Sequence, residues 1–219
     1  MRLCFFAIVL RPDIAFAINL LSRFTSNFDK NHVRDVKRVF EYLSSTINLG
    51  IKYKNGGSGL ILSGYSDADF ANYVETRRST SGYIFMLANG PVTWSTKRQP
   101  IVTLSTTESE YVAASFAARE LVWLKNLLNN FECQYASPIV LHIDNESAVR
   151  MIRNPEYHKR TKHIDIQYHF IKERFQLGEF AIQSVTSELQ KADIFTKALP
   201  RDKLNRMCEI IDMFNNENL

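Results

Sequence analysis

The chain has 219 residues, of which 45% are hydrophobic and 23% are charged, a composition typical of a folded protein rather than a disordered one. Its formal net charge of +4 is by itself a weak indication of a polyanionic partner. The three cysteines are far apart and odd in number, so a disulfide framework and a zinc site are both disfavoured and a reducing setting is favoured.

The first part of the chain contains an apolar run, residues 3–10, followed by Ala15-Phe16-Ala17, which has the small-x-small form of a signal cleavage site. The run is only eight residues long and Arg11-Pro12-Asp13 interrupts it, so a secretory signal is the less favoured interpretation. No stretch approaches the roughly 18 apolar residues of a membrane span. We therefore expect no association with a membrane.

Two helices are predicted before residue 55. Pro12 suits a first helical turn, and apolar residues follow it at helical spacing as far as Phe24. The second helix covers about residues 29–45 and ends at Asn48-Leu49-Gly50. Residues 54–59, Lys-Asn-Gly-Gly-Ser-Gly, are the clearest linker and indicate a domain boundary. The predicted units are a helical segment at 1–55, a main domain at 56–205 and a C-terminal tail at 206–219.

Strands and helices are interspersed after the linker. Strands are predicted at residues 60–67, 81–87, 92–95 (with Val102 and Leu104 as further strand material), 139–143 and 180–185. Helices are predicted at residues 107–130, 146–153, 164–177 and 189–198, the last ended by Pro200. Asn89-Gly90 is a hairpin signal between two of the strands. This order predicts an α/β fold with a mixed five-stranded sheet flanked by helices.

Four acids stand near the ends of predicted elements rather than on exposed faces. Asp67 follows the first strand, and Asp144 ends the fourth. Glu110 lies early in the long helix and Asp193 early in the last one. Carboxylates from separate elements are the oxygen ligands that Mg²⁺ takes. Two such ions about 4 Å apart can activate water and stabilise the leaving oxygen of a phosphodiester.

Each acid also has a structural interpretation, which is favoured when that acid is considered alone. In chain order, the alternatives are a turn at Asp67 or Asp69, capping boxes at Ser105–Glu108 and Thr107–Glu110, a helix cap at Asp144 and a helix-dipole partner at Asp193. Spacing alone therefore leaves both the metal site and the structural roles open.

Seven short motifs, in order and without a visible gap, resemble copia-type ribonuclease H over about residues 60–205. They are Tyr65–Ala71, Arg78–Tyr83, Trp94–Gln99, Leu104–Ala114, Asp144–Ala148, Arg160–Asp165 and Gln190–Lys197. Any one motif is weak, but the set is specific. Arg11–Ile14 and Val36–Leu43 resemble the segment that joins reverse transcriptase to ribonuclease H in the copia polyprotein, whereas residues 1–10 do not look like the polyprotein upstream of that point.

The resemblance implies a ribonuclease H-like fold preceded by a small helical segment. It implies that Asp67, Glu110, Asp144 and Asp193 are the catalytic and metal-binding residues, with two Mg²⁺ ions for which Mn²⁺ can substitute. Asp67 is preferred to Asp69 because the family's first acid lies on the strand. Glu110 is preferred to Glu108 because it precedes Tyr-Val-Ala-Ala.

The implied substrate is an RNA–DNA hybrid, whose RNA strand is cut to leave a 5′-phosphate and a 3′-hydroxyl. The predicted nucleic-acid contacts are Lys97, Arg98, Asn145, Arg160, Lys162 and His163. Residues 185–190 lack the histidine that many cellular ribonucleases H carry before the last acid, as in the copia family in general, and this puts the turnover rate in doubt.

The resemblance also predicts a protein partner and a location. The partner is the reverse transcriptase part of the parent polyprotein, and the location is the cytoplasm, a virus-like particle or the nucleus, in preference to secretion. The oligomeric state is left open. The competing hypothesis is a catalytically silent or host-captured fragment that binds nucleic acid or a protein.

Overall fold

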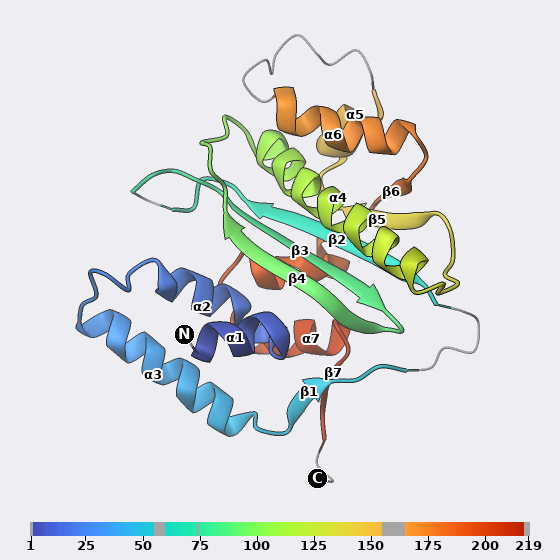
Figure 1. The fold of residues 1–219 in the computed structure, drawn as a ribbon. Helices are drawn as coiled ribbons and strands as arrows, with labels where there is room; N and C mark the ends of the chain where they lie inside the picture. The colour runs from blue at the N-terminus through green and yellow to red at the C-terminus, as the bar shows by residue number, and fades with distance from the viewer. Residues whose placement is uncertain (1, 55–59, 74, 155–164, 217–219) are drawn as a thin grey trace.

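The computed structural model describes residues 2–54, 60–73, 75–154 and 165–216, with no side-chain description for residues 2 and 165–169. A five-stranded sheet of order β4-β3-β2-β5-β6 lies at its centre (Figure 1). Its strands are β2 (Leu62–Asp69), β3 (Thr80–Leu87), β4 (Gly90–Arg98), β5 (Ile139–Ile143) and β6 (Phe180–Ser184). The first three are antiparallel neighbours, while β5 runs parallel to both β2 and β6. The predicted mixed five-stranded sheet is confirmed.

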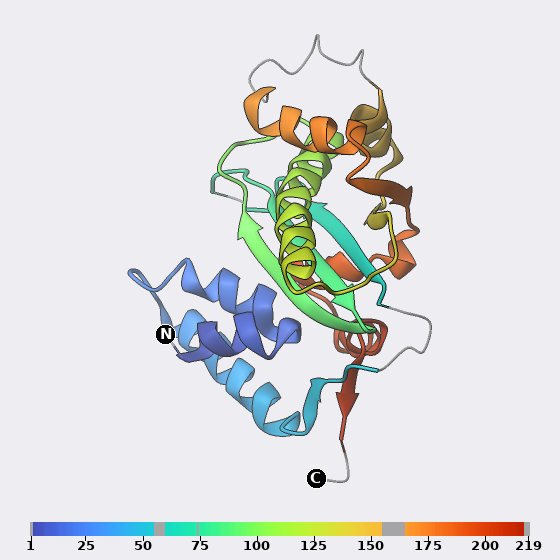
Figure 2. The same cartoon turned by 45° about the vertical axis from the view of Figure 1, so that its right-hand side comes forward.

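One face of the sheet is covered by the long helix α4 (Thr106–Asn130), with α5 (Glu146–Arg153) and α6 (Asp165–Gln176) beside it (Figure 2). Four fully buried alanines of α4, at positions 113, 114, 117 and 118, let the helix backbone approach the sheet closely. Phe85, Leu121 and Leu141 pack in the core between the two layers. This layer sets the position of the first turns of α4 over β2.

The opposite face is covered by segments from both ends of the chain, and both views show them on the side away from α4 (Figure 1 and Figure 2). These are α1 (Arg2–Val9), η1 (Pro12–Ile14), α2 (Ala15–Ser22), η5 (Lys191–Phe195) and α7 (Arg201–Ile210). Ile84 and Met86 of β3 pack there against Ala15, Phe195 and Met207. Two further bonds fix the N-terminal helices to the sheet: the Trp94 indole donates to the Ala7 carbonyl at 2.7 Å, and the Asn19 amide donates to the Thr96 carbonyl at 3.0 Å.

The N-terminal helical segment has a polar centre of its own. Arg11 Nη2 lies 2.7 Å from Asp13 Oδ2, and the Tyr42 hydroxyl donates to the same oxygen at 2.8 Å. Tyr42 belongs to α3 (Lys30–Ser45), whose buried Val39 packs against Ile18 of α2. The bond from Tyr42 to Asp13 and the packing of Val39 on Ile18 therefore join α3 to α2 and to the turn before it.

Contacts cross both predicted domain boundaries. β1 (Leu49–Ile51) pairs antiparallel with β7 (Met213–Asn215), and α7 continues across residue 205. Met207, Ile211 and Met213 are buried beneath the sheet. The division into residues 1–55, 56–205 and 206–219 stays a prediction.

Two sequence predictions of local structure were wrong. Residues 189–198 do not form one helix but belong mainly to two short 3-10 turns, η4 (Ser187–Leu189) and η5, and Pro200 caps the start of α7 instead of ending a helix. Proline lacks an N–H that the first turn does not need, so it begins a helix more readily than it continues one. Val102 and Leu104 lie in no strand, and Leu104 is exposed. The helix predicted over about residues 29–45 is confirmed as α3, whereas the strand β1 that follows it was not predicted.

The apolar run at residues 3–10 forms most of α1, which contributes buried Ala7 to the helical segment. None of the helices in the described ranges combines the length and apolar character needed to cross a membrane.

Candidate active site

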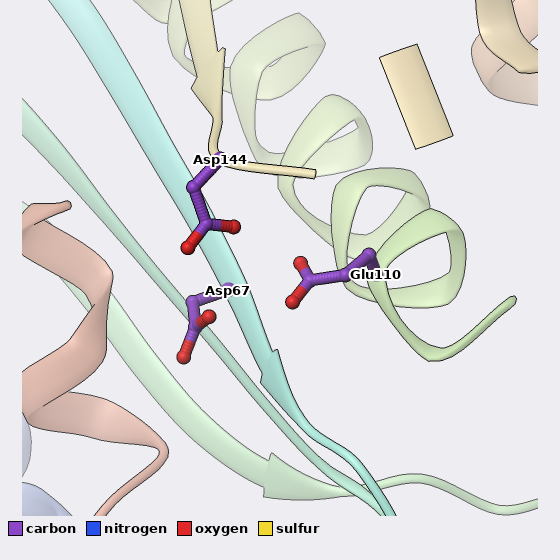
Figure 3. A group of neighbouring side chains, drawn as sticks. All are labelled: Asp67, Glu110 and Asp144. Carbon is purple, nitrogen blue, oxygen red and sulfur yellow. The ribbon is translucent and has the colours of Figure 1, made fainter. Parts of the chain in front are cut away.

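Three carboxylates meet at one edge of the sheet (Figure 3). Asp67 lies on β2, Asp144 directly follows β5, and Glu110 lies in the second turn of α4. Because β2 and β5 are parallel and Ser66 pairs with Ile143, the carboxyl ends of both strands meet at the same edge. Ligand oxygens of the three acids lie within 4.8 Å of one another. This group of three is called the carboxylate cluster below.

The carboxylate cluster is poorly solvated, and its negative charges repel one another. Asp67 and Glu110 are buried, and Asp144 is half-buried. Burial, followed by the charges of Asp67 and Asp144, raises the pKa of Glu110 to about 10. Burial also raises the pKa of Asp67 to about 6 and the pKa of Asp144 above its ordinary value. A cation placed among these oxygens would favour their charged forms.

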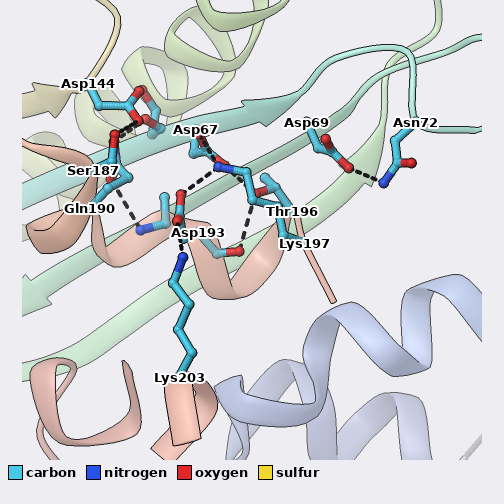
Figure 4. Close-up of polar contacts among 12 residues, drawn as sticks. Asp67, Asp69, Asn72, Asp144, Ser187, Gln190, Asp193, Thr196, Lys197 and Lys203 are labelled. Atoms are coloured by element: carbon cyan, nitrogen blue, oxygen red, sulfur yellow. Dashed lines mark hydrogen bonds and ion pairs between the residues drawn. The ribbon is translucent and has the colours of Figure 1, made fainter. Parts of the chain in front are cut away.

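Asp193 lies beside the cluster but is held by two lysines (Figure 4). Lys197 Nζ lies 2.8 Å from Asp193 Oδ1 and 3.3 Å from Asp67 Oδ2, so its ammonium joins the two acids. Lys203 Nζ lies 3.6 Å from the other Asp193 oxygen. Burial lowers the pKa of Lys197, but the charges of Asp67 and Asp193 outweigh it and the pKa is raised. Lys197 is therefore a fixed positive charge inside the acidic site.

The η5 turn, which carries Asp193, is attached directly to the strand that carries Asp67. The Gln190 amide donates to the Ser66 carbonyl at 2.9 Å, and the Thr196 hydroxyl donates to Asp67 Oδ2. Sequence reasoning did not single out Thr196 or Lys197, although both lie in or beside the Gln190–Lys197 motif that it quoted. No local pattern indicates which side chain of that motif reaches β2.

Gly82 lets η5 approach the sheet. It pairs with Asp67, and a Cβ at this position would lie 2.7 Å from Phe195 Cβ and 2.8 Å from Thr196 Cγ2. Gly82→Ala is therefore expected to lower the free energy of unfolding by about 1–3 kcal/mol, the usual cost of overpacking. Urea denaturation of Gly82→Ala beside Gly50→Ala measures this, because a Cβ at Gly50 meets nothing within 4 Å. Equal stability of the two variants would show that η5 moves away without cost.

The two alternative acids have structural partners and lie outside the carboxylate cluster. Asp69 is half-buried, and its carboxylate accepts a hydrogen bond from the Asn72 amide. The Glu108 carboxylate accepts from the Leu104 backbone N–H at 2.6 Å, and its own N–H donates to Ser105, the helix cap. The geometry thus groups Asp67 and Glu110, and not Asp69 and Glu108, with Asp144.

The predicted nucleic-acid contacts are only partly within the described residues. Lys97 is exposed near the end of β4, and Arg98 ends that strand. Asn145 caps α5, since its side-chain oxygen accepts from the Ala148 N–H at 2.9 Å. Arg160, Lys162 and His163 lie outside the described residues.

Fold and cluster together define an α/β domain with a candidate hard-cation site at a sheet edge. No family model matches the chain. A retrovirus-related Pol polyprotein from transposon TNT 1-94 of Nicotiana tabacum is 38% identical over 206 residues, which cover 94% of this chain and 15% of the polyprotein. The secreted RxLR effector protein 161 of Plasmopara viticola is 49% identical over 117 residues, which cover 53% of this chain and 82% of the effector.

Among solved structures, LC11-RNase H1 in complex with an RNA/DNA hybrid aligns with a TM-score of 0.46 and 14% identity, covering 62% of this chain and 93% of that chain. Over most of its length the chain is similar to retrovirus-related transposon Pol polyproteins, which confirms the resemblance predicted from the sequence motifs. It spans only 15% of the length of the Nicotiana tabacum polyprotein.

Proposed function

We propose that this chain is a metal-dependent endonuclease that cleaves the RNA strand of RNA–DNA hybrids. The observation that carries the proposal is the carboxylate cluster, whose three acids lie on β2, on α4 and directly after β5 and place ligand oxygens within 4.8 Å of one another. The ordered motifs that resemble copia-type ribonuclease H and the Pol polyprotein relatives support the choice of substrate.

The cluster fits a divalent cation by its donor chemistry. All donors are carboxylate oxygens, which suit Mg²⁺ or Mn²⁺. Oε2 of Glu110 is buried without a hydrogen-bond partner among the described residues, so one oxygen is available as a ligand. We propose that Asp67, Glu110, Asp144 and Asp193 hold two Mg²⁺ ions, with Mn²⁺ as a substitute. When bound, such ions polarise a phosphate oxygen and lower the pKa of water.

The residues of the chain then have separate tasks. Asp67, Glu110 and Asp144 lose their protons and provide the oxygens around the scissile phosphate. Lys197 fixes Asp193 beside Asp67 and adds a positive charge near the phosphate. Cutting leaves a 5′-phosphate and a 3′-hydroxyl. Backbone phosphate contacts position the duplex, and the 2′-hydroxyls together with the groove shape select the RNA strand.

The test is cleavage of an end-labelled RNA–DNA hybrid by the purified chain in Mg²⁺, beside Asp144→Asn and with double-stranded DNA and double-stranded RNA of the same sequence. We expect cutting of the RNA strand of the hybrid alone, and loss of that cutting in Asp144→Asn. A chain that is folded by circular dichroism but cuts no hybrid in Mg²⁺ or Mn²⁺ would contradict the proposal.

A second candidate function is favoured by the effector relative, of which the aligned residues cover 82%. In this case the chain is a captured, catalytically silent fragment that binds nucleic acid or a protein. Hybrid binding without cleavage would support it. Under the first function, the proposed protein partner is the reverse transcriptase part of the parent polyprotein, and the intracellular location stays a prediction.

A further inference from the structure

Two arginines from distant parts of the chain converge on one tyrosine ring. Arg23 directly follows α2, Arg98 is the last residue of β4, and Tyr73 lies in the connection between β2 and β3. The guanidinium carbon of Arg23 lies 5.4 Å from the centre of the Tyr73 ring, and that of Arg98 lies 5.0 Å from it. These three residues are called the arginine pair and its tyrosine below.

The arginine pair brings like charges together without an acidic partner. Among the ion pairs of the described residues, none includes Arg23 or Arg98. Arg23 Nη2 donates instead to neutral oxygens, Asn19 Oδ1 at 2.9 Å and Thr80 Oγ1 at 3.4 Å. Burial, followed by the charge of Arg98, lowers the pKa of Arg23. An anion bound beside two neighbouring cations offsets the repulsion between them.

Glu75 is an acid close to the same tyrosine, but among the described residues it forms no ion pair with Arg23 or Arg98. Glu75 is exposed, and its Oε2 accepts from the Tyr73 hydroxyl at 3.0 Å. This bond fixes the orientation of the ring on which both guanidinium groups rest. Attraction between each cation and the face of the Tyr73 ring helps to hold both guanidinium groups beside it.

The arginine pair lies at the same end of the sheet as the carboxylate cluster. Asp69 pairs with Thr80 and Thr80 pairs with Arg98, so these residues form one row across β2, β3 and β4. Two inter-strand spacings, about 10 Å, separate Asp69 from Arg98, and Asp67 of the carboxylate cluster lies two residues before Asp69 on β2. A duplex carries a phosphate about every 3.4 Å of its axis on each strand. A strand with one phosphate at the carboxylates therefore has others within reach of the arginines.

We propose that Arg23 and Arg98, supported by Tyr73, bind a backbone phosphate of the nucleic-acid duplex whose scissile phosphate lies at the carboxylate cluster. The proposal rests on the proposed function for its ligand. A guanidinium group offers paired N–H donors that match two phosphate oxygens, and the anion neutralises both positive charges. Since Arg23 belongs to the N-terminal helical segment, that segment contributes directly to substrate binding and is more than a connection.

The test is binding of a fluorescein-labelled RNA–DNA hybrid by the full chain carrying Asp144→Asn, measured by fluorescence anisotropy over a range of salt concentrations. We expect Arg23→Gln and Arg98→Gln each to weaken binding about 5- to 20-fold and to lower the slope of log Kd against log salt by about 1. The double variant should lose little more than either single one, because both side chains hold one phosphate. Arg98→Lys should keep the salt slope but only part of the affinity.

The matched control is Arg206→Gln, since Arg206 is exposed on α7. A Kd and salt slope for both arginine variants equal to those of Arg206→Gln would overturn the proposal. Circular dichroism and thermal melting show whether each variant is folded. Arg98→Lys, which keeps the charge, separates lost phosphate binding from a disturbed fold.

A second measurement distinguishes failure of this inference from failure of the proposed function. Inorganic phosphate should raise the thermal midpoint of the parent chain and not that of the Arg23→Gln, Arg98→Gln double variant. If the parent chain binds no hybrid but shows this response, the phosphate site stands and the proposed substrate is wrong. The arginine pair is not an anion site if phosphate leaves the thermal midpoint of the parent chain unchanged and the arginine variants bind the hybrid as Arg206→Gln does.

Discussion

Replacing Glu110 with glutamine is expected to lower cleavage of an RNA–DNA hybrid at least about 100-fold while leaving the fold intact, because a cation ligand contributes several kcal/mol and each 1.36 kcal/mol is a factor of ten in rate. Burial and the neighbouring acids raise the pKa of Glu110 to about 10, so its carboxyl is neutral at pH 7 before a cation binds. Glutamine has the same shape and no charge. The substitution thus removes the anionic ligand at little cost to the metal-free protein.

The matched control is Glu108→Gln, two residues earlier on the same helix. The Glu108 carboxylate accepts from the Leu104 N–H at 2.6 Å, and an amide oxygen accepts the same bond. We expect the cleavage rate of this variant to stay within a few-fold of the parent. Initial rates per folded chain, with the folded fraction taken from circular dichroism, measure both effects. An active Glu110→Gln beside an inactive Glu108→Gln would move the ligand to Glu108.

The sequence predicted most reliably those elements whose side chains are sorted by local periodicity. The strand at Ile139–Ile143 and the helix at Glu146–Arg153 were predicted with the bounds that the structure has. Along α4, apolar residues at helical spacing such as Val112, Leu121 and Leu128 are buried. These patterns depend only on neighbours within one or two turns, so they are visible in the chain itself.

The errors lie where distant residues decide the local structure. Residues 187–195 form 3-10 turns because the Gln190 amide bonds to the Ser66 carbonyl and Phe195 packs under Gly82. The three-residue strand β1 exists only because β7 pairs with it from the other end of the chain. Neither partner is indicated by the sequence around the element that it fixes.

The residues of the candidate site also fall into two groups, those that the sequence could place together and those that only the fold brings together. Asp67 and Asp144 could be grouped from the sequence, since acids at the ends of two buried strands meet when those strands are parallel neighbours. The position of Lys197 could not, because its ammonium joins Asp193 on its own turn to Asp67 on a strand 130 residues earlier. That contact is a product of the fold.

The metal-free chain is expected to become less stable as the pH rises from 6 to 8. In this range folded Glu110, with a pKa of about 10, keeps a proton that the unfolded chain, with a pKa near 4.5, has lost. Where the folded state binds the extra proton, the free energy of unfolding falls by about 1.4 kcal/mol per pH unit. For a chain of this size that is about 3–6 °C in Tm per pH unit. The raised pKa of Lys197 does not oppose this trend, because lysine keeps its proton in both states until the pH is well above 8.

Thermal melting in EDTA at several pH values measures this slope, and Glu110→Gln is expected to flatten it because the variant has no proton to hold.

Adding Mg²⁺ or Mn²⁺ should raise the Tm of the parent, and more so at pH 8 than at pH 6, since binding requires the deprotonated carboxylates. At a concentration about 100 times the Kd the gain is about 2.7 kcal/mol. EDTA should reverse it, and Glu110→Gln should show less of it. A Tm that is flat in EDTA and unchanged by either ion would mean that Glu110 is neither protonated when metal-free nor a ligand. The proton and the cation compete for the same oxygens. If the carboxylate cluster is the metal site, the Tm in EDTA must therefore fall with rising pH while the gain in Tm caused by the ion increases.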